Sequence, residues 1–270
     1  MMALMATTST TGFALAAHNA REHTYQALEQ PPILDLPPPA SVSLIMKNLN
    51  EEAFIARCIE SLLNQSIIKK YPDSFEILVV DGGSDDRSVE IAKQYPLRVM
   101  TTSKGILHQM NFGIENTTGD IIVFIDSDSY YPPYWLEKIL EFLHDDNVSM
   151  VHTSMIDEDS GNYILPLANI LRIFTMVAYG GGQAIRRTVF EATGLFDETM
   201  DCVYQIRVFT EAEMNITQRA MTVGDVRYQW DNPFITSFRR QNVEAIKHEC
   251  IRDPNGPNCR YAMDVGVARF

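Results

Sequence analysis

Short apolar runs alternate with amphipathic stretches through the first half of the chain. The mostly apolar runs are Val42–Met46, Phe75–Val80, Leu97–Met100 and Ile121–Asp126. The run Ile121–Ile125 is apolar without a break, which predicts a strand that is buried on both faces, and the other three runs predict further strands of the sheet. Between the runs, apolar residues recur at helical spacing, as at Phe54, Ile55, Cys58, Ile59, Leu62 and Leu63. The alternation predicts an α/β fold with a doubly wound, mostly parallel sheet flanked by helices.

The second half of the chain continues this pattern less regularly. Apolar residues at helical spacing predict a helix over Pro132–Leu143, and Val148–Thr153 predicts another strand. Trp135 belongs to the inward-facing stripe of that helix, which favours a place in the core over a place in a binding site. The strongly apolar stretch Leu165–Val177 is shorter than a bilayer-spanning helix requires. We expect it to cover the sheet, with contact with a membrane surface as the alternative.

Composition limits the class of protein. The chain has 270 residues, of which 46% are hydrophobic, enough to bury the core of one large domain. The net charge of −13 argues against nucleic acid as a partner, since phosphate binding requires clustered Lys and Arg. Cys58 falls on a helical apolar stripe, where it is expected to pack as a small hydrophobe. Residues Met1–Ala17 lack the basic start of a secretion signal, so we expect a cytoplasmic protein, with peripheral membrane contact left open.

Residues 1–40 differ from the rest of the chain. They include a proline-rich stretch from Pro31 to Pro39, which suits an extended linker. The segment shows no apolar periodicity, so we expect an N-terminal tail and linker over 1–40, followed by a folded domain over 41–270. Removal of residues 1–38 is expected to leave folding nearly unchanged.

Polar and acidic side chains recur where the predicted strands end. After successive strands come Asn50, Glu52, Asp81, Gly82, Ser84, Asp126 and Asp128. Each has a structural explanation as a cap or turn residue. Asn50 is a candidate N-cap of the first helix, and Ser84 or Asp85 is a candidate N-cap of the second. Ligands of open α/β sheets bind outside the carboxyl ends of the strands. Recurrence at one edge therefore favours a binding site, in which Asp126 and Asp128 could hold a hard cation and phosphate oxygens.

Four motifs in a fixed order resemble those of a known family: Val42–Glu52, Glu76–Asp86, Met110–Gly113 and Phe124–Asp128. Together they resemble the inverting, GT-A-fold glycosyltransferases of family 2, over roughly 41–238. The resemblance implies a Rossmann-like GT-A domain with a nucleotide-binding half at 41–130 and an acceptor half at 131–270. It also implies a nucleotide-sugar donor, UDP- or GDP-linked, and a divalent cation, Mn²⁺ or Mg²⁺. The sugar would pass with inversion to a hydroxyl of a glycan or lipid-linked acceptor.

The resemblance also implies roles for individual residues. The implied nucleotide-sugar-binding residues are Asn48, Asn50, Glu52, Asp81, Gly82, Gly105, Asn111, Asp126 and Ser127. Within this set, Asp81 matches the carboxylate that contacts the base, and Asp126 matches a residue near the ribose and metal. Asp128 matches the direct metal ligand. On the acceptor side glycines permit close backbone approach, and the implied residues are Gly181, Gly182 and Gln183.

The segment Thr210–Met214 resembles the acidic start of the family's catalytic helix. Glu211 stands at the place of the catalytic base, where the family usually has aspartate, and Glu213 is then placed on the acceptor side. Thr210 replaces the usual first acid, and Met110 stands where the family often has arginine. Two other classes therefore stay open: a nucleotidyltransferase, and a non-catalytic module that binds sugar nucleotides.

Overall fold

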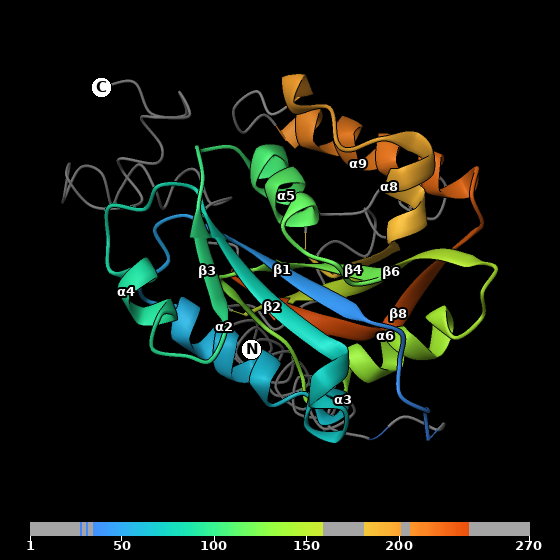
Figure 1. The fold of residues 1–270 in the computed structure, drawn as a ribbon, viewed down its shortest axis with the longest axis horizontal. Helices are drawn as coiled ribbons and strands as arrows, with labels where there is room; N and C mark the ends of the chain where they lie inside the picture. The colour runs from blue at the N-terminus through green and yellow to red at the C-terminus, as the bar shows by residue number, and fades with distance from the viewer. Residues whose placement is uncertain (1–27, 29–30, 32–34, 159–180, 201–205, 238–270) are drawn as a thin grey trace, which may run out of the picture.

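The computed structural model describes residues 28, 31, 35–158, 181–200 and 206–237 (Figure 1). The strands are β1 (Val42–Asn48), β2 (Phe75–Asp81), β3 (Arg98–Thr101), β4 (Ile121–Asp126), β5 (Ser129–Tyr130), β6 (Val148–Asp157), β7 (Gln183–Arg186) and β8 (Asp225–Thr236). They form an eight-stranded sheet in the order β3-β2-β1-β4-β7-β6-β8-β5. The helices are α2 (Ile55–Leu63), α3 (Ser66–Lys70), α4 (Ser88–Ala92), α5 (Ile106–Glu115), α6 (Trp135–Leu143), α8 (Arg187–Thr193) and α9 (Ile206–Met221), with the short 3-10 helices η1 (Pro72–Ser74) and η2 (Glu198–Met200).

The apolar runs of the first half form the strands predicted for them. β1 pairs in parallel with both β2 and β4, and β2 pairs in parallel with β3. Parallel neighbours need crossover connections, which the predicted helices between the strands supply. β1 continues beyond Met46 to Asn48 and so carries Lys47 into the sheet.

The other half of the sheet is mixed. β7 runs antiparallel to both β4 and β6, and β5 runs antiparallel to β8, whereas β6 and β8 are parallel. The sequence did not indicate β7, a four-residue strand, or its place between β4 and β6. The α/β fold with helices on both faces is confirmed, but the parallel order holds mainly for the first half of the sheet.

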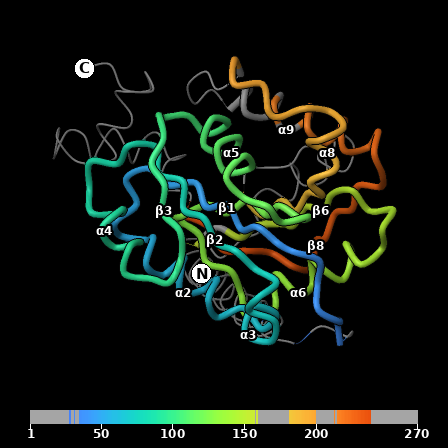
Figure 2. The backbone as a smooth tube through the Cα atoms, viewed as in Figure 1, coloured from blue at the N-terminus to red at the C-terminus, as the bar shows by residue number. Residues whose placement is uncertain are grey.

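Alternate residues of each strand pack into two cores. Leu44 and Met46 of β1 lie in the core with α2, α3 and α6, whereas Ile45 lies in the core with α5, α8 and α9. The two groups of helices lie on opposite faces of the sheet (Figures 1 and 2). Trp135 is fully buried in the first core, which confirms its interpretation as a core residue. Cys58 is fully buried there too, as expected of a small hydrophobe.

Part of the predicted tail packs on the domain. Leu36 lies in the core with α2 and α3, and Leu28 is buried against Ile156 and Ile235. The Tyr71 hydroxyl donates a hydrogen bond to the Leu36 carbonyl at 3.1 Å. The interpretation of residues 1–40 as a separate tail and linker therefore misses two packed leucines, and the effect of removing residues 1–38 stays a prediction. A single leucine in a proline-rich stretch has no periodicity from which its burial could be predicted.

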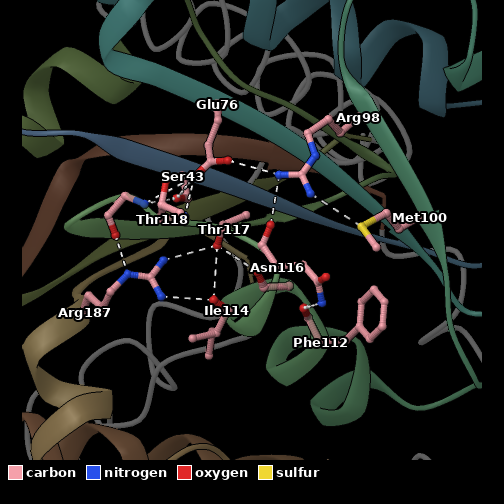
Figure 3. A network of polar contacts seen from close by, with 12 residues as sticks. Ser43, Glu76, Arg98, Met100, Phe112, Ile114, Asn116, Thr117, Thr118 and Arg187 are labelled. Atoms are coloured by element: carbon pink, nitrogen blue, oxygen red, sulfur yellow. Dashed lines mark hydrogen bonds and ion pairs between the residues drawn. The ribbon is translucent and has the colours of Figure 1, made fainter.

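A hydrogen-bond network fixes the turn between α5 and β4 (Figure 3). The Glu76 carboxylate accepts hydrogen bonds from the Ser43 hydroxyl at 2.8 Å and from the Gly119 amide at 3.2 Å. A Cβ on Gly119 would lie 2.5 Å from the Ser43 nitrogen, so only glycine fits there. The turn thereby sets where β4 begins. It also sets the register that pairs Asp126 with Lys47 at the other end of the two strands.

The apolar stretch Leu165–Val177, which was expected to cover the sheet, lies outside the described residues. Within the part of the chain that the structure describes, no helix combines the length and the apolar character needed to cross a bilayer.

Candidate functional site

The loops that follow β1 and β2 are joined by hydrogen bonds. Asn48 ends β1 in register with Asp81, and its Nδ2 donates to Asp81 Oδ1 at 2.8 Å. Asn50 has a left-handed backbone with a φ of 55°. Its amide donates to Ser84 Oγ at 2.9 Å, and its Oδ1 accepts from the Asp85 amide at 2.9 Å. The structure thus brings Asn48, Asn50 and Asp81 together at the carboxyl edge of the sheet, as predicted.

The predicted helix caps are wrong. The residue that precedes α2 is Phe54 and the one that precedes α4 is Arg87, and neither makes a capping hydrogen bond through its side chain. Asn50, Ser84 and Asp85 lie earlier in each loop and bond to the neighbouring loop instead. Residues of these types suit caps and turns equally well, so the sequence could not separate the two uses.

Glu52 extends the contact between the loops. Its amide donates to Asp86 Oδ2 at 2.9 Å, and its Oε2 accepts from the Arg87 amide at 3.1 Å. Beside it, the Glu51 amide donates to Ser88 Oγ at 2.8 Å. We call residues 48–52 and 81–88 the paired loops. Because so many bonds cross between them, a change in one loop displaces the other.

The carboxylate of Asp81 is used within the paired loops. Oδ2 accepts from the amides of Gly83 at 3.0 Å and Ser84 at 2.9 Å, and Oδ1 accepts from the side chains of Asn48 and Ser84. A carboxylate has about four acceptor sites, so Asp81 holds the loop in place. Gly82 donates its amide to the Asn48 carbonyl at 2.9 Å. The contact of Asp81 with a base stays a prediction.

Asp126 ends β4 and is joined to Lys47 of β1. The two residues are register partners, and Lys47 Nζ lies 2.7 Å from Asp126 Oδ1. The Lys47 side chain is 8% exposed and that of Asp126 is 31% exposed. An ammonium group buried this deeply requires an opposite charge, because its transfer out of water is otherwise very costly. The ion pair therefore fixes the Asp126 carboxylate at the edge of the sheet.

The glycine-rich segment, Gly181 and Gly182, packs closely against Asp126. A Cβ on Gly181 would lie 2.2 Å from Asp126 Oδ2, and one on Gly182 would lie 2.5 Å from the Phe234 ring. Gly182 also has a φ of 73°, a conformation that favours glycine. Gln183 follows as the buried first residue of β7. The predicted acceptor-side residues thus lie beside the carboxylate predicted to be near the metal.

Ser127 and Asp128 form the turn between β4 and β5. Ser127 is buried and Asp128 is half-buried. The pKa of the Cys58 thiol is raised, first by burial and then by the negative charges of Asp128 and Asp126. Both carboxylates therefore lie close enough to the Cys58 thiol, beneath the turn, to raise its pKa. The protonated thiol donates to the Asp126 carbonyl at 3.4 Å, which joins α2 to the end of β4.

Asp126 and Asp128 determine how well this edge suits a divalent cation. Within the described ranges, His, Cys, Asp and Glu side chains form no metal-binding group of three or more. Two carboxylates are nonetheless the hard oxygen donors that Mg²⁺ and Mn²⁺ prefer, and such sites take further ligands from phosphate and water. The pair therefore suits a cation that is held jointly with a phosphate-bearing ligand.

The two predicted residues that follow β3 are Gly105, just before α5, and Asn111, within it. Gly105 precedes the helix with a φ of 149°. In the first turn, Gln109 Nε2 donates to the Asn48 carbonyl at 2.8 Å, so the start of α5 borders the paired loops. Asn111 lies on another face of the helix. Its side chain donates to and accepts from the Phe196 backbone at 2.9 Å. A contact between Asn111 and a ligand would require these bonds to break.

α9 includes both acidic residues predicted for the chemistry, Glu211 and Glu213. Their backbone is helical, and their side chains lie outside the described part of the structure. Ala212 and Ile216 are buried in the core shared with α5, which sets the rotation of the helix. Positions 211 and 213 therefore flank the buried stripe, each about 100° from position 212. Which of the two faces the site stays a prediction.

Two residues of this edge, Lys47 and Gln109, were not among the predicted site residues. The prediction ends the first strand at Met46 and so places Lys47 in a loop, where lysine is common. The signal that could have identified Lys47 is its place directly after the apolar run Val42–Met46, where the strand can continue. No local pattern indicated Gln109, because its Nε2 donates to the carbonyls of Asn48 in β1 and Val80 in β2, which are distant in sequence.

Comparison with known proteins identifies a family with sequence similarity. The family model described as glycosyl transferase family 2 matches residues 43–212. The uncharacterized glycosyltransferase EpsJ of Bacillus subtilis is 28% identical over 200 residues, which cover 64% of this chain and 57% of EpsJ. The chain therefore spans little more than half the length of this relative.

Solved structures with a similar fold include two complexes with nucleotide sugars. The mannosyltransferase PcManGT of Pyrobaculum calidifontis, in complex with GDP-Man and Mn²⁺, has a TM-score of 0.59 and 20% identity, covering 96% of this chain and 79% of its own. TarS 1-349 of S. aureus, in complex with UDP-GlcNAc, has a TM-score of 0.59 and 16% identity, covering 83% and 70%. These likenesses confirm the predicted GT-A fold.

Proposed function

The chain belongs to glycosyl transferase family 2, and from this membership we propose that it transfers a sugar from a nucleotide-sugar donor to an acceptor hydroxyl, with a divalent cation and with inversion at the anomeric carbon. The observation that carries the proposal is the meeting of the paired loops with Asp126 and Asp128 at one edge of the sheet. Ligands of open α/β sheets bind at this edge.

The donor nucleotide is proposed to lie against the paired loops and the first turn of α5. Glu52 is exposed on this rim and Asn50 is half-buried, so both are within reach of a ligand. The positive end of α5, after Gly105, would offset the negative charge of a diphosphate. The GDP-Man and UDP-GlcNAc of the two similar structures support a UDP- or GDP-sugar.

The cation is proposed to bind at Asp128, with Asp126 and Ser127 beside it. When bound, a divalent cation offsets the charge that develops on the departing nucleoside diphosphate. The Mn²⁺ in the PcManGT complex supports Mn²⁺ or Mg²⁺. The chain itself holds the two carboxylates in place: Lys47 bonds to Asp126, and the turn that follows β4 carries Asp128.

Glu211 is proposed as the general base. It would take the proton of the acceptor hydroxyl as that oxygen bonds to the anomeric carbon and the bond from that carbon to the diphosphate oxygen breaks. Attack on the face opposite the leaving group produces inversion. Glu213 would contact the acceptor, a glycan or a lipid-linked sugar. Gly181 and Gly182, whose backbones approach Asp126 and Phe234 closely, would lie beneath the reacting sugar.

Asp128→Ala tests the metal assignment. The melting temperature is measured with UDP- and GDP-sugars, each with and without Mn²⁺. A ligand at a hundredfold excess over its Kd stabilises the fold by about 2.7 kcal/mol. The wild type should therefore gain stability from one donor only with metal, and Asp128→Ala should lose that gain. Asp73→Ala, an exposed aspartate just before β2, is the matched control and should keep it.

A transfer assay with product analysis completes the test. Asp128→Ala should release no nucleoside diphosphate from the donor, and the wild-type product should have the anomeric configuration opposite to that of the donor. Wild-type turnover by Asp128→Ala in the presence of a chelator would show that the metal assignment is wrong. Release of pyrophosphate in place of nucleoside diphosphate would indicate a nucleotidyltransferase.

A further inference from the structure

Lys47 places a positive charge inside the carboxyl edge of the sheet. Its backbone pairs with Val80 on one side and Asp126 on the other, so the ammonium is held at the centre of that edge. The Lys47 side chain is 8% exposed, and Nζ lies 2.7 Å from Asp126 Oδ1. Burial of an ammonium group is costly even when it is paired. A strand of this kind would be more simply built with an apolar residue at position 47.

The Lys47 pair also limits what Asp126 can do. Its Oδ1 bonds to Lys47, and its Oδ2 lies so close to Gly181 that a Cβ there would be 2.2 Å away. Both oxygens therefore contact the chain itself, and the Asp126 side chain is 31% exposed. Asp128 differs from Asp126 in lying beyond the strand, in the turn that leads to β5.

We infer that Lys47 is a positioning residue that neutralises Asp126 and keeps it from ligating the metal, so that the divalent cation binds tightly only together with a nucleoside diphosphate. The inference rests on the proposed function and goes further, because it divides the roles of the two aspartates. With Asp126 neutralised, Asp128 alone attracts the cation weakly, and the diphosphate must supply the remaining oxygen ligands. The ammonium in turn cancels the charge of Asp126, which would otherwise repel the diphosphate.

The inference is tested by measuring Mn²⁺ binding directly, from the electron paramagnetic resonance signal of free Mn²⁺, alone and with UDP or GDP. In the wild type, the diphosphate should tighten Mn²⁺ binding by about tenfold or more. In Lys47→Met, Mn²⁺ alone should bind about tenfold more tightly than in the wild type, because Asp126 loses its counter-charge. Without metal, the same variant should bind the diphosphate more weakly.

A double variant separates ligation from charge. Lys47→Met with Asp126→Asn removes both charges of the pair, a change that proteins tolerate better than the loss of one partner. Its affinities for Mn²⁺ alone and for the diphosphate without metal should both stay near those of the wild type, because the net charge at this edge is unchanged. Lys70→Met is the matched control, since Lys70 pairs with Asp35 just before β2 begins. It should leave both affinities unchanged.

Several outcomes would overturn the inference. Unchanged or weaker binding of Mn²⁺ alone by Lys47→Met would do so. A tenfold loss of that affinity in the double variant would too, because it would show that Asp126 ligates the metal. If Lys47→Met does not fold, the double variant decides alone. If the wild type itself takes up no Mn²⁺ with either diphosphate, the metal-dependent function fails as well, and the two failures are thereby distinguished.

Discussion

Gly181→Ala should displace the Asp126 carboxylate. The new Cβ would lie 2.2 Å from Asp126 Oδ2 and 2.9 Å from its Cγ. Ordinary contacts between heavy atoms lie at about 3.5–4.0 Å, so the carboxylate or the glycine-rich segment must move by about 1 Å. The carboxylate cannot move far without breaking its 2.7 Å bond to Lys47. Gly181 is not among the glycines with positive φ, so the effect would come from the contact and not from the backbone.

The expected cost is larger in rate than in stability. A shift of about 1 Å in groups that must position the reactants costs on the order of a hundredfold in rate. Overpacking of this size costs about 1–3 kcal/mol of stability. We therefore expect Gly181→Ala to fold, to melt several degrees lower, and to transfer sugar about a hundredfold more slowly, with weaker donor binding.

The assay compares Gly181→Ala with Gly194→Ala. Gly194 has a φ of 88°, and a Cβ there would meet no atom within 4 Å. Alanine at Gly194 therefore strains the backbone, at a cost of about 1 kcal/mol or more, without touching Asp126. Melting temperature, donor affinity and transfer rate are measured for both variants. If Gly181→Ala keeps the wild-type rate and donor affinity, the close approach to Asp126 plays no part in the reaction and our reasoning fails.

Two further predictions concern acidic residues. Glu211→Gln should slow transfer by about a hundredfold or more and leave donor affinity nearly unchanged, whereas Glu213→Gln should mainly weaken acceptor binding; an inactive Glu213→Gln beside an active Glu211→Gln would exchange the two roles. Partial burial would raise the pKa of Glu76, but hydrogen bonds from Thr118 and Ser43 outweigh burial and lower that pKa. The ionised carboxylate therefore stabilises the fold above its unfolded pKa, and this stabilisation is lost as the pH falls through its folded pKa. Glu76→Gln should therefore lower the free energy of unfolding by about 1 kcal/mol at neutral pH and by less in acid, and a pH-independent difference in urea unfolding would contradict this.

The sequence alone predicted the half of the sheet that contains β1, β2, β3 and β4. β1, β2 and β4 are nearly continuous apolar runs, β3 is shorter and more exposed, and the helices between the strands have their own apolar stripes, so the information is local. The same patterns placed Trp135 and Cys58 in the core. They also brought Asn48, Asp81 and Asp126 to one edge, because strands that run in parallel end on the same side.

Contacts between distant segments were decided only by the tertiary structure. Asn50 and Ser84 look like helix caps in sequence, yet they bond to each other and so join the loops that follow the adjacent strands β1 and β2. The antiparallel place of β7 and the burial of Leu36 likewise depend on neighbours far along the chain. The Lys47–Asp126 ion pair is the clearest case. Its charge partner is 79 positions away in sequence and becomes adjacent only when the register of β1 and β4 is set, which no local pattern encodes.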